Sequence, residues 1–141
     1  MGRVGRPLYG ERDYMSLNVL VVDDSKLARM SVAKSLTALH PDWSRVEATN
    51  ADEALALARA SPPDIALLDF NMPGRDGLSL AADFRALAPS MVLAIVSANV
   101  QTEVVAKAKK IGAEFLPKPL TQDALAKFLN LAVERLKLAT K

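Results

Sequence analysis

Short apolar runs alternate with amphipathic segments along most of this chain. The segments 17–22, 65–68 and 91–96 are almost continuously aliphatic, and each stops at a polar residue. Runs of this length and composition are typical of strands buried on both faces of a parallel sheet. Two shorter stretches, 45–48 and 114–116, predict a second and a fifth strand.

The segments between these runs have the spacing of helices. Ala28, Val32, Leu36 and Leu39 fall on one face of a first helix. Asn50 and Glu53 have the spacing of a helix start, and Pro62-Pro63 ends that second helix. A third helix is expected through Leu78, Leu80 and Phe84, and a fourth from about 103 to 111 with Gly112 as its terminator.

The last helix is predicted to begin near Thr121. Its core stripe comprises Leu125, Phe128, Leu129, Ala132 and Leu136, whereas Leu131 and Leu138 lie outside the stripe and hint at a contact surface. Five successive strand-then-helix units predict a doubly wound α/β domain with a parallel sheet and helices on both faces.

Composition narrows the class of protein. Half of the 141 residues are hydrophobic and 24% are charged, which is a globular balance. The absence of cysteine excludes disulfides and thiolate metal sites. No apolar run approaches the roughly 18 residues of a membrane span, and no signal peptide is evident, so we expect a cytoplasmic protein without membrane insertion.

The net charge of +2 is small, and its one basic concentration is Lys107, Lys109 and Lys110. We therefore expect no direct nucleic-acid binding. Residues 1–14 show no apolar periodicity and contain three glycines and a proline. We interpret them as a flexible extension, native or introduced by the expression vector, and residues 15–141 as one domain.

Three acidic residues stand at the ends of two predicted strands. Asp23 and Asp24 follow the first run, and Asp69 follows the run 65–68. Ligands of open α/β sheets bind beyond the carboxyl ends of the strands, where these side chains would meet. Crowded carboxylates repel one another unless a cation shares them, and Mg²⁺ is the usual cation beside phosphate. The pattern therefore predicts metal-assisted phosphoryl chemistry.

Asp69 is the candidate nucleophile, because a carboxylate can hold a phosphoryl group as an acyl phosphate. Lys118 follows the fifth strand and can bring an ammonium group to the same edge. The Ser97 hydroxyl and the Ala98 amide could donate to phosphoryl oxygens, and the Asn71 backbone carbonyl could supply a further metal ligand.

Four motifs, each at a strand end, resemble the response-regulator receiver domains, the CheY-like family. They are Val22-Asp23-Asp24-Ser25, Leu67-Leu68-Asp69-Phe70-Asn71-Met72-Pro73-Gly74, Val96-Ser97-Ala98-Asn99 and Phe115-Leu116-Pro117-Lys118-Pro119. The resemblance covers about residues 17–138 and implies a flavodoxin-like sheet of strand order 2-1-3-4-5. It also implies a cis peptide bond between Lys118 and Pro119.

By this resemblance, Asp69 accepts a phosphoryl group from a phosphohistidine on a sensor histidine kinase or a histidine phosphotransfer protein. Asp23, Asp24, Asp69 and the Asn71 carbonyl would hold Mg²⁺. Ser97, the Ala98 amide and Lys118 would bind the phosphoryl oxygens, while Ser97 and Phe115 would act as the switch pair.

The expected protein is a stand-alone receiver, a signalling switch and not a turnover enzyme. Its output would be contact with a downstream protein through the fourth helix, fifth strand and fifth helix, in a chemotaxis-like pathway or a phosphorelay. Two alternatives stay open. One is a phosphatase with an aspartyl-phosphate intermediate, although Asn71 stands where such enzymes place a second aspartate. The other is an adaptor that works without phosphorylation.

Overall fold

The computed structural model describes residues 16–139 as five strands alternating with five helices. In chain order the elements are β1 (Asn18–Val22), α1 (Lys26–Leu39), β2 (Ser44–Ala48), α2 (Ala51–Ala60), β3 (Ile65–Asp69), α3 (Gly77–Leu87), β4 (Val92–Ser97), α4 (Thr102–Lys110), β5 (Ala113–Pro117) and α5 (Gln122–Ala139). All ten predicted elements are therefore present. The expected fourth helix lies one residue earlier at each end than predicted.

The strands form one parallel sheet in the order β2-β1-β3-β4-β5. This is the flavodoxin-like arrangement that the resemblance implied, and that prediction is confirmed. The register places Asp69 beside Val96, and Ser97 beside Pro117. The polar residues that end β3 and β4 and those that follow β1 and β5 consequently gather at one edge of the sheet.

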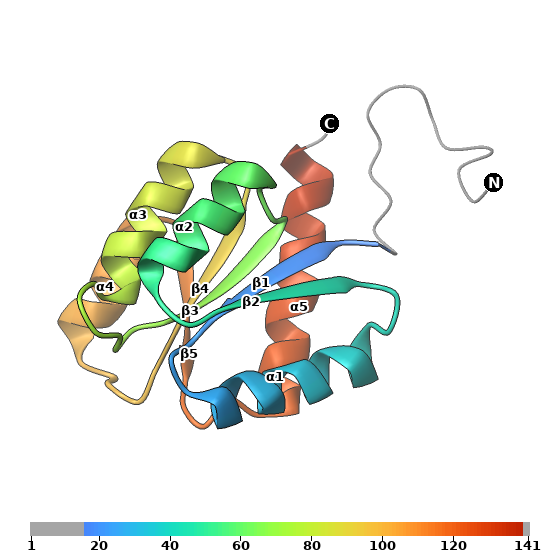
Figure 1. The fold of residues 1–141 in the computed structure, drawn as a ribbon, viewed down its shortest axis with the longest axis horizontal. Helices are drawn as coiled ribbons and strands as arrows, with labels where there is room; N and C mark the ends of the chain where they lie inside the picture. The colour runs from blue at the N-terminus through green and yellow to red at the C-terminus, as the bar shows by residue number, and fades with distance from the viewer. Residues whose placement is uncertain (1–15, 140–141) are drawn as a thin grey trace.

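Helices cover both faces of the sheet (Figure 1). On one face, α1 and α5 pack over a core that includes Val21, Leu67 and Leu129. On the other, α2, α3 and α4 pack over a core that includes Leu20, Leu68 and Phe84. Because both faces are covered, every residue of β3 and β4 is buried, whereas edge strand β2 is exposed except at Ala48.

Local signals for the helix ends are confirmed by hydrogen bonds. The Asn50 side chain accepts from the Glu53 backbone N–H at 2.8 Å and thereby caps α2. Ser25 and Asp76 cap α1 and α3 in the same manner. Gly112 has a positive φ of 78°, as expected of a glycine that stops a helix and starts the next turn.

The predicted stripe of α5 is buried as expected, and Leu131 and Leu138 are exposed. The predicted apolar stripe of α1 is less completely buried. Only Leu36 is buried, while Ala28, Val32 and Leu39 are half-buried. Leu36 is therefore the one residue of this stripe that lies within the core, and Val32 and Leu39 pack against it.

The predicted extension, residues 1–14, lies outside the described residues. Between residues 16 and 139, no helix combines the length and the hydropathy needed to cross a bilayer. The Lys118-Pro119 peptide bond is cis, as the resemblance implied.

Candidate functional site

Three carboxylates converge at the carboxyl edge of the sheet. Asp69 is the last residue of β3, and Asp23 and Asp24 directly follow β1, which pairs with β3. One carboxylate oxygen from each of the three lies within 4.8 Å of the others. Asp69 and Asp23 are only 5% and 7% exposed, whereas Asp24 faces solvent. The predicted convergence of these side chains is therefore observed.

The turn between β1 and α1 fixes the direction of Asp23. Its Oδ1 accepts a hydrogen bond from the Ser25 backbone N–H at 2.9 Å. Its own backbone N–H donates to the Ala48 carbonyl at 3.1 Å, which ties the turn to the end of β2. Asp23 is thus held by both its main chain and its side chain.

Lys118 joins two of the three carboxylates. Its Nζ lies 3.2 Å from Asp23 Oδ2 and 3.1 Å from Asp69 Oδ1. The Lys118 backbone N–H donates to the Ser97 carbonyl, so the residue is anchored to the end of β4. An ammonium group therefore sits where the sequence predicted it, between carboxylates that would otherwise repel each other.

Burial and the crowding of charged groups shift the pKa values of Asp69 and Lys118. Burial raises the pKa of the Asp69 carboxyl, as does the charge of Asp23, although Lys118 and the Asn71 backbone N–H oppose the shift. Burial alone would lower the pKa of Lys118, but its hydrogen bonds and charge attraction to Asp69 and Asp23 prevail and raise it. Lys118 therefore stays charged, while ionised Asp69 carries an energetic cost that a further cation would relieve.

Ser97 closes the site on the side of β4. It is 1% exposed, and its Oγ accepts a hydrogen bond from the Asn99 backbone N–H at 2.9 Å. The Ser97 hydroxyl hydrogen remains able to donate to an anion. Ala98, the next residue, is exposed at the start of the β4–α4 loop. Both residues lie at the carboxyl end of β4, and their role as donors to phosphoryl oxygens stays a prediction.

Two other predicted residues lie in neighbouring elements. Asn71 is exposed in the β3–α3 loop, and its backbone N–H donates to the Asp69 carboxylate. Its carbonyl as a metal ligand stays a prediction. Phe115 is half-buried in β5, paired in register with Ile95. Its role as a switch also stays a prediction.

Gly77, the first residue of α3, shapes the site although the sequence analysis did not single it out. A Cβ atom at this position would lie 2.5 Å from the Asp69 backbone carbonyl oxygen. The Gly77 backbone N–H also donates to the Phe70 carbonyl at 3.0 Å. The Asp76-Gly77 pair was visible in the sequence as a turn signal, but the close approach to Asp69 depends on the fold.

An apolar hollow of about 480 Å³ opens beside the carboxylates. It lies between the N-terminal half of α1 and the β5–α5 loop, with Val21, Leu67 and Val96 among its lining residues and Asp23 and Lys118 at its polar side. The exposed side chain of Leu27 forms part of its wall. Ala28 and Val32 line the hollow, which accounts for their incomplete burial.

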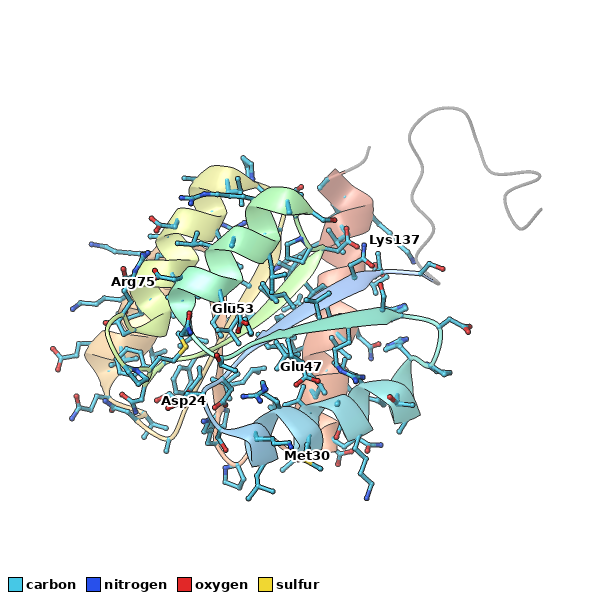
Figure 2. The ribbon with its side chains drawn as sticks, viewed as in Figure 1. Asp24, Met30, Glu47, Glu53, Arg75 and Lys137 are labelled. Carbon is cyan, nitrogen blue, oxygen red and sulfur yellow. The ribbon has the colours of Figure 1, made fainter. Side chains whose placement is uncertain are left out.

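The donor set suits a hard divalent cation. Carboxylate oxygens are the preferred ligands of Mg²⁺, and three of them lie close enough to share one ion. Asp24 keeps a solvent-exposed side chain, as befits a metal that retains several waters (Figure 2). The residues present therefore fit a magnesium site.

Comparison with known proteins identifies the family of this chain. Residues 19–130 match the sequence profile of the response regulator receiver domain. The positive alginate biosynthesis regulatory protein of Pseudomonas aeruginosa is 38% identical over 120 residues, which are 82% of this chain and 47% of the relative. The nitrate/nitrite response regulator protein NarL of Escherichia coli is 35% identical over 116 residues, 81% of this chain and 53% of NarL. The chain thus spans about half the length of these curated relatives.

Solved structures agree in fold. The chemotaxis protein CheY4 of Vibrio cholerae superimposes with a TM-score of 0.76 at 27% identity, covering 83% of this chain and 98% of CheY4. The sequence match, residues 19–130, includes β3, β4 and all of β1 except its first residue. The three acidic residues and Ser97 follow or end these strands. The chain belongs to the response regulator receiver domain family.

Proposed function

We propose that this protein is a response regulator that takes a phosphoryl group onto Asp69 with the help of Mg²⁺. One observation carries the proposal: three carboxylates and the Lys118 ammonium converge at the carboxyl edge of a parallel sheet. Asp23, Asp24 and Asp69 would hold the ion, together with the Asn71 carbonyl. When bound, Mg²⁺ would neutralise negative charge on the oxygens of the phosphoryl group during its transfer.

The proposed step is an in-line displacement at phosphorus. A carboxylate oxygen of Asp69 attacks the phosphoryl group of a phosphohistidine, and the P–O bond forms as the P–N bond breaks. The histidine nitrogen keeps the electron pair of the broken bond. The Lys118 ammonium, the Ser97 hydroxyl and the Ala98 amide would donate to the phosphoryl oxygens, which positions the group on Asp69.

The phosphodonor would be a sensor histidine kinase or a histidine phosphotransfer protein. Leu27 and Met30 support a docking surface on α1, because both are exposed apolar side chains near the start of that helix. Figure 2 shows Met30 on the outer side of α1. Leu27 continues this surface into the apolar hollow that reaches Lys118. A partner helix with apolar side chains would bury both residues.

The output would use the surface formed by α4, β5 and α5. Phosphorylation adds about two negative charges at Asp69. Movement of Ser97 and Phe115 toward the modified site would transmit this change to that surface. Exposed Val100 precedes α4, and Lys107, Lys109 and Lys110 lie in its last turn, so the surface offers apolar and basic contacts to a target protein. Such a target would belong to a chemotaxis-like pathway or a phosphorelay.

Asp69→Asn tests the site directly. Incubated with acetyl phosphate and Mg²⁺, the wild-type protein should gain one acid-stable, base-labile phosphate, observed by intact-mass spectrometry. Asp69→Asn should gain none, because the amide cannot form an acyl phosphate. Asp42→Asn, a change of an exposed turn aspartate, is the matched control and should be labelled like wild type. Labelling of Asp69→Asn at the wild-type rate would refute the assignment, and sustained turnover of phosphate esters would favour the phosphatase alternative.

A second experiment addresses the output. Beryllofluoride with Mg²⁺ mimics the phosphoryl group, and a pull-down with the mimic should retain a target that the unmodified protein retains weakly. Lys107→Glu in α4 should reduce this retention without changing phosphorylation, because it reverses one charge of the proposed surface. Equal retention with and without the mimic would instead indicate an adaptor that does not depend on phosphorylation.

A further inference from the structure

Arg29 links the acidic site to the edge of the sheet. It lies in the second turn of α1, and its side chain is only 13% exposed. Its Nη1 donates to the Asp23 backbone carbonyl at 2.7 Å, and its Nε donates to Glu47 Oε1 at 3.1 Å. Figure 2 shows Glu47 reaching from β2 toward α1. One guanidinium therefore contacts both the acidic turn and the edge strand.

The contact with the Asp23 carbonyl has a particular geometric consequence. That carbonyl belongs to the peptide unit that joins Asp23 to Asp24. Because a peptide unit is planar, holding its oxygen restricts the rotation that sets the directions of both flanking residues. The Asp23 N–H is already tied to Ala48. Arg29 thus completes the fixation of two successive carboxylates through their main chain.

We infer that Arg29 is a positioning residue for the metal site and that Glu47 orients it. Arg29 touches no carboxylate of the cluster, so it acts through the Asp23–Asp24 peptide unit. Glu47 holds the guanidinium from β2 and is itself shared with Arg45, whose Nε lies 3.1 Å from Glu47 Oε2. This inference rests on the proposed function, because it assumes that the cluster binds Mg²⁺.

Positioning and simple electrostatics predict opposite results when the guanidinium is removed. A cation near three carboxylates disfavours the binding of a second cation, so charge alone predicts tighter Mg²⁺ binding in its absence. Positioning predicts weaker binding, because the two carboxylates would sample directions that do not face the ion. Loss of groups that orient metal ligands typically weakens metal binding by at least about tenfold. The sign of the change therefore separates the two explanations.

The experiment measures Mg²⁺ affinity by isothermal titration calorimetry on the unphosphorylated protein. Arg29→Met keeps the aliphatic stem and removes both hydrogen bonds, and it should weaken Mg²⁺ binding by about tenfold. Its labelling by acetyl phosphate should fall at low Mg²⁺ and recover at saturating Mg²⁺. Arg29→Lys keeps the charge but cannot reproduce the two-pronged contact, so it should give an intermediate loss.

Arg45→Met is the matched control. It removes an arginine and the other partner of Glu47 but touches no residue of the site, so its Mg²⁺ affinity should stay within about twofold of wild type. Wild-type or tighter binding by Arg29→Met, or an equal loss in Arg45→Met, would overturn the inference. If Arg29→Met does not fold, Arg29→Lys decides, and unchanged affinity there is the refuting result. A wild-type protein that binds no Mg²⁺ would refute the proposed function itself.

Discussion

Replacing Lys118 with methionine tests the charge balance of the site. The substitution keeps an unbranched, flexible side chain of similar length and removes the ammonium that lies 3.2 Å from Asp23 and 3.1 Å from Asp69. At an effective dielectric constant of about 20, each of these contacts represents roughly 5 kcal/mol of Coulomb attraction. Desolvation of the three groups offsets most of this attraction, and the Lys118 side chain is 31% exposed, so solvent screens the remainder.

We therefore expect Lys118→Met to lose about 1–2 kcal/mol of unfolding free energy at pH 7 without Mg²⁺. The pKa of Asp69 should rise further, because the cation that opposes the effect of burial is gone. The loss of stability should consequently shrink as the pH falls and Asp69 becomes protonated. Saturating Mg²⁺ should also reduce the loss, since the ion supplies the missing positive charge.

Urea unfolding followed by circular dichroism, at several pH values and with and without Mg²⁺, measures these differences. Lys26→Met, at the exposed first residue of α1, is the control and should change stability by less than about 0.5 kcal/mol. If Lys118→Met loses the same free energy at all pH values and Mg²⁺ concentrations, the ammonium does not balance the carboxylates. The reasoning on the charge of the site would then be wrong.

Three further substitutions probe the same edge of the sheet. Because the pKa of Asp69 is higher in the folded protein than in the unfolded chain, protonated Asp69 stabilises the fold. This stabilisation is complete below the unfolded-state pKa and is lost as the pH rises through the folded-state pKa. The asparagine side chain does not ionise, so without Mg²⁺ the Asp69→Asn protein should become more stable relative to wild type as the pH rises toward 7. A difference in urea midpoint between the two proteins that does not change with pH would contradict this expectation. Gly77→Ala places a Cβ atom 2.5 Å from the Asp69 carbonyl oxygen and should cost about 2–3 kcal/mol and slow labelling. Gly74→Ala meets no atom within 4 Å but has a φ of 86°, so it should cost only about 1 kcal/mol and leave labelling near wild type.

Much of the fold was predictable because its signals are local. Continuous aliphatic runs indicated β3 and β4, which are buried on both faces. The Asn50 and Glu53 spacing located the start of α2, and Gly112 located the end of α4 within one residue. Each of these features depends on a residue and its near neighbours, so a single sequence suffices to recognise it.

The convergence of the acidic residues was also predictable, for a different reason. In a parallel sheet all strands end at the same edge, so residues that follow different strands meet there. Asp23, Asp24, Asp69, Ser97 and Lys118 each follow or end a strand, and the structure brings the three carboxylates and the ammonium into contact range. The strand order itself came from the family resemblance and not from the hydrophobic pattern.

The amino-acid sequence by itself determined the helices and strands, the parallel sheet and which side chains reach its carboxyl edge. Hydrophobic periodicity and strand ends can be recognised from consecutive residues. Only the tertiary structure decided that Arg29 of α1 contacts the Asp23 carbonyl and Glu47 of β2, and that Gly77 lies against Asp69. It also decided that the first half of α1 stands over an apolar hollow. These contacts join elements that are distant in the chain. Their geometry depends on how the helices pack on the sheet, and no local sequence pattern specifies that packing.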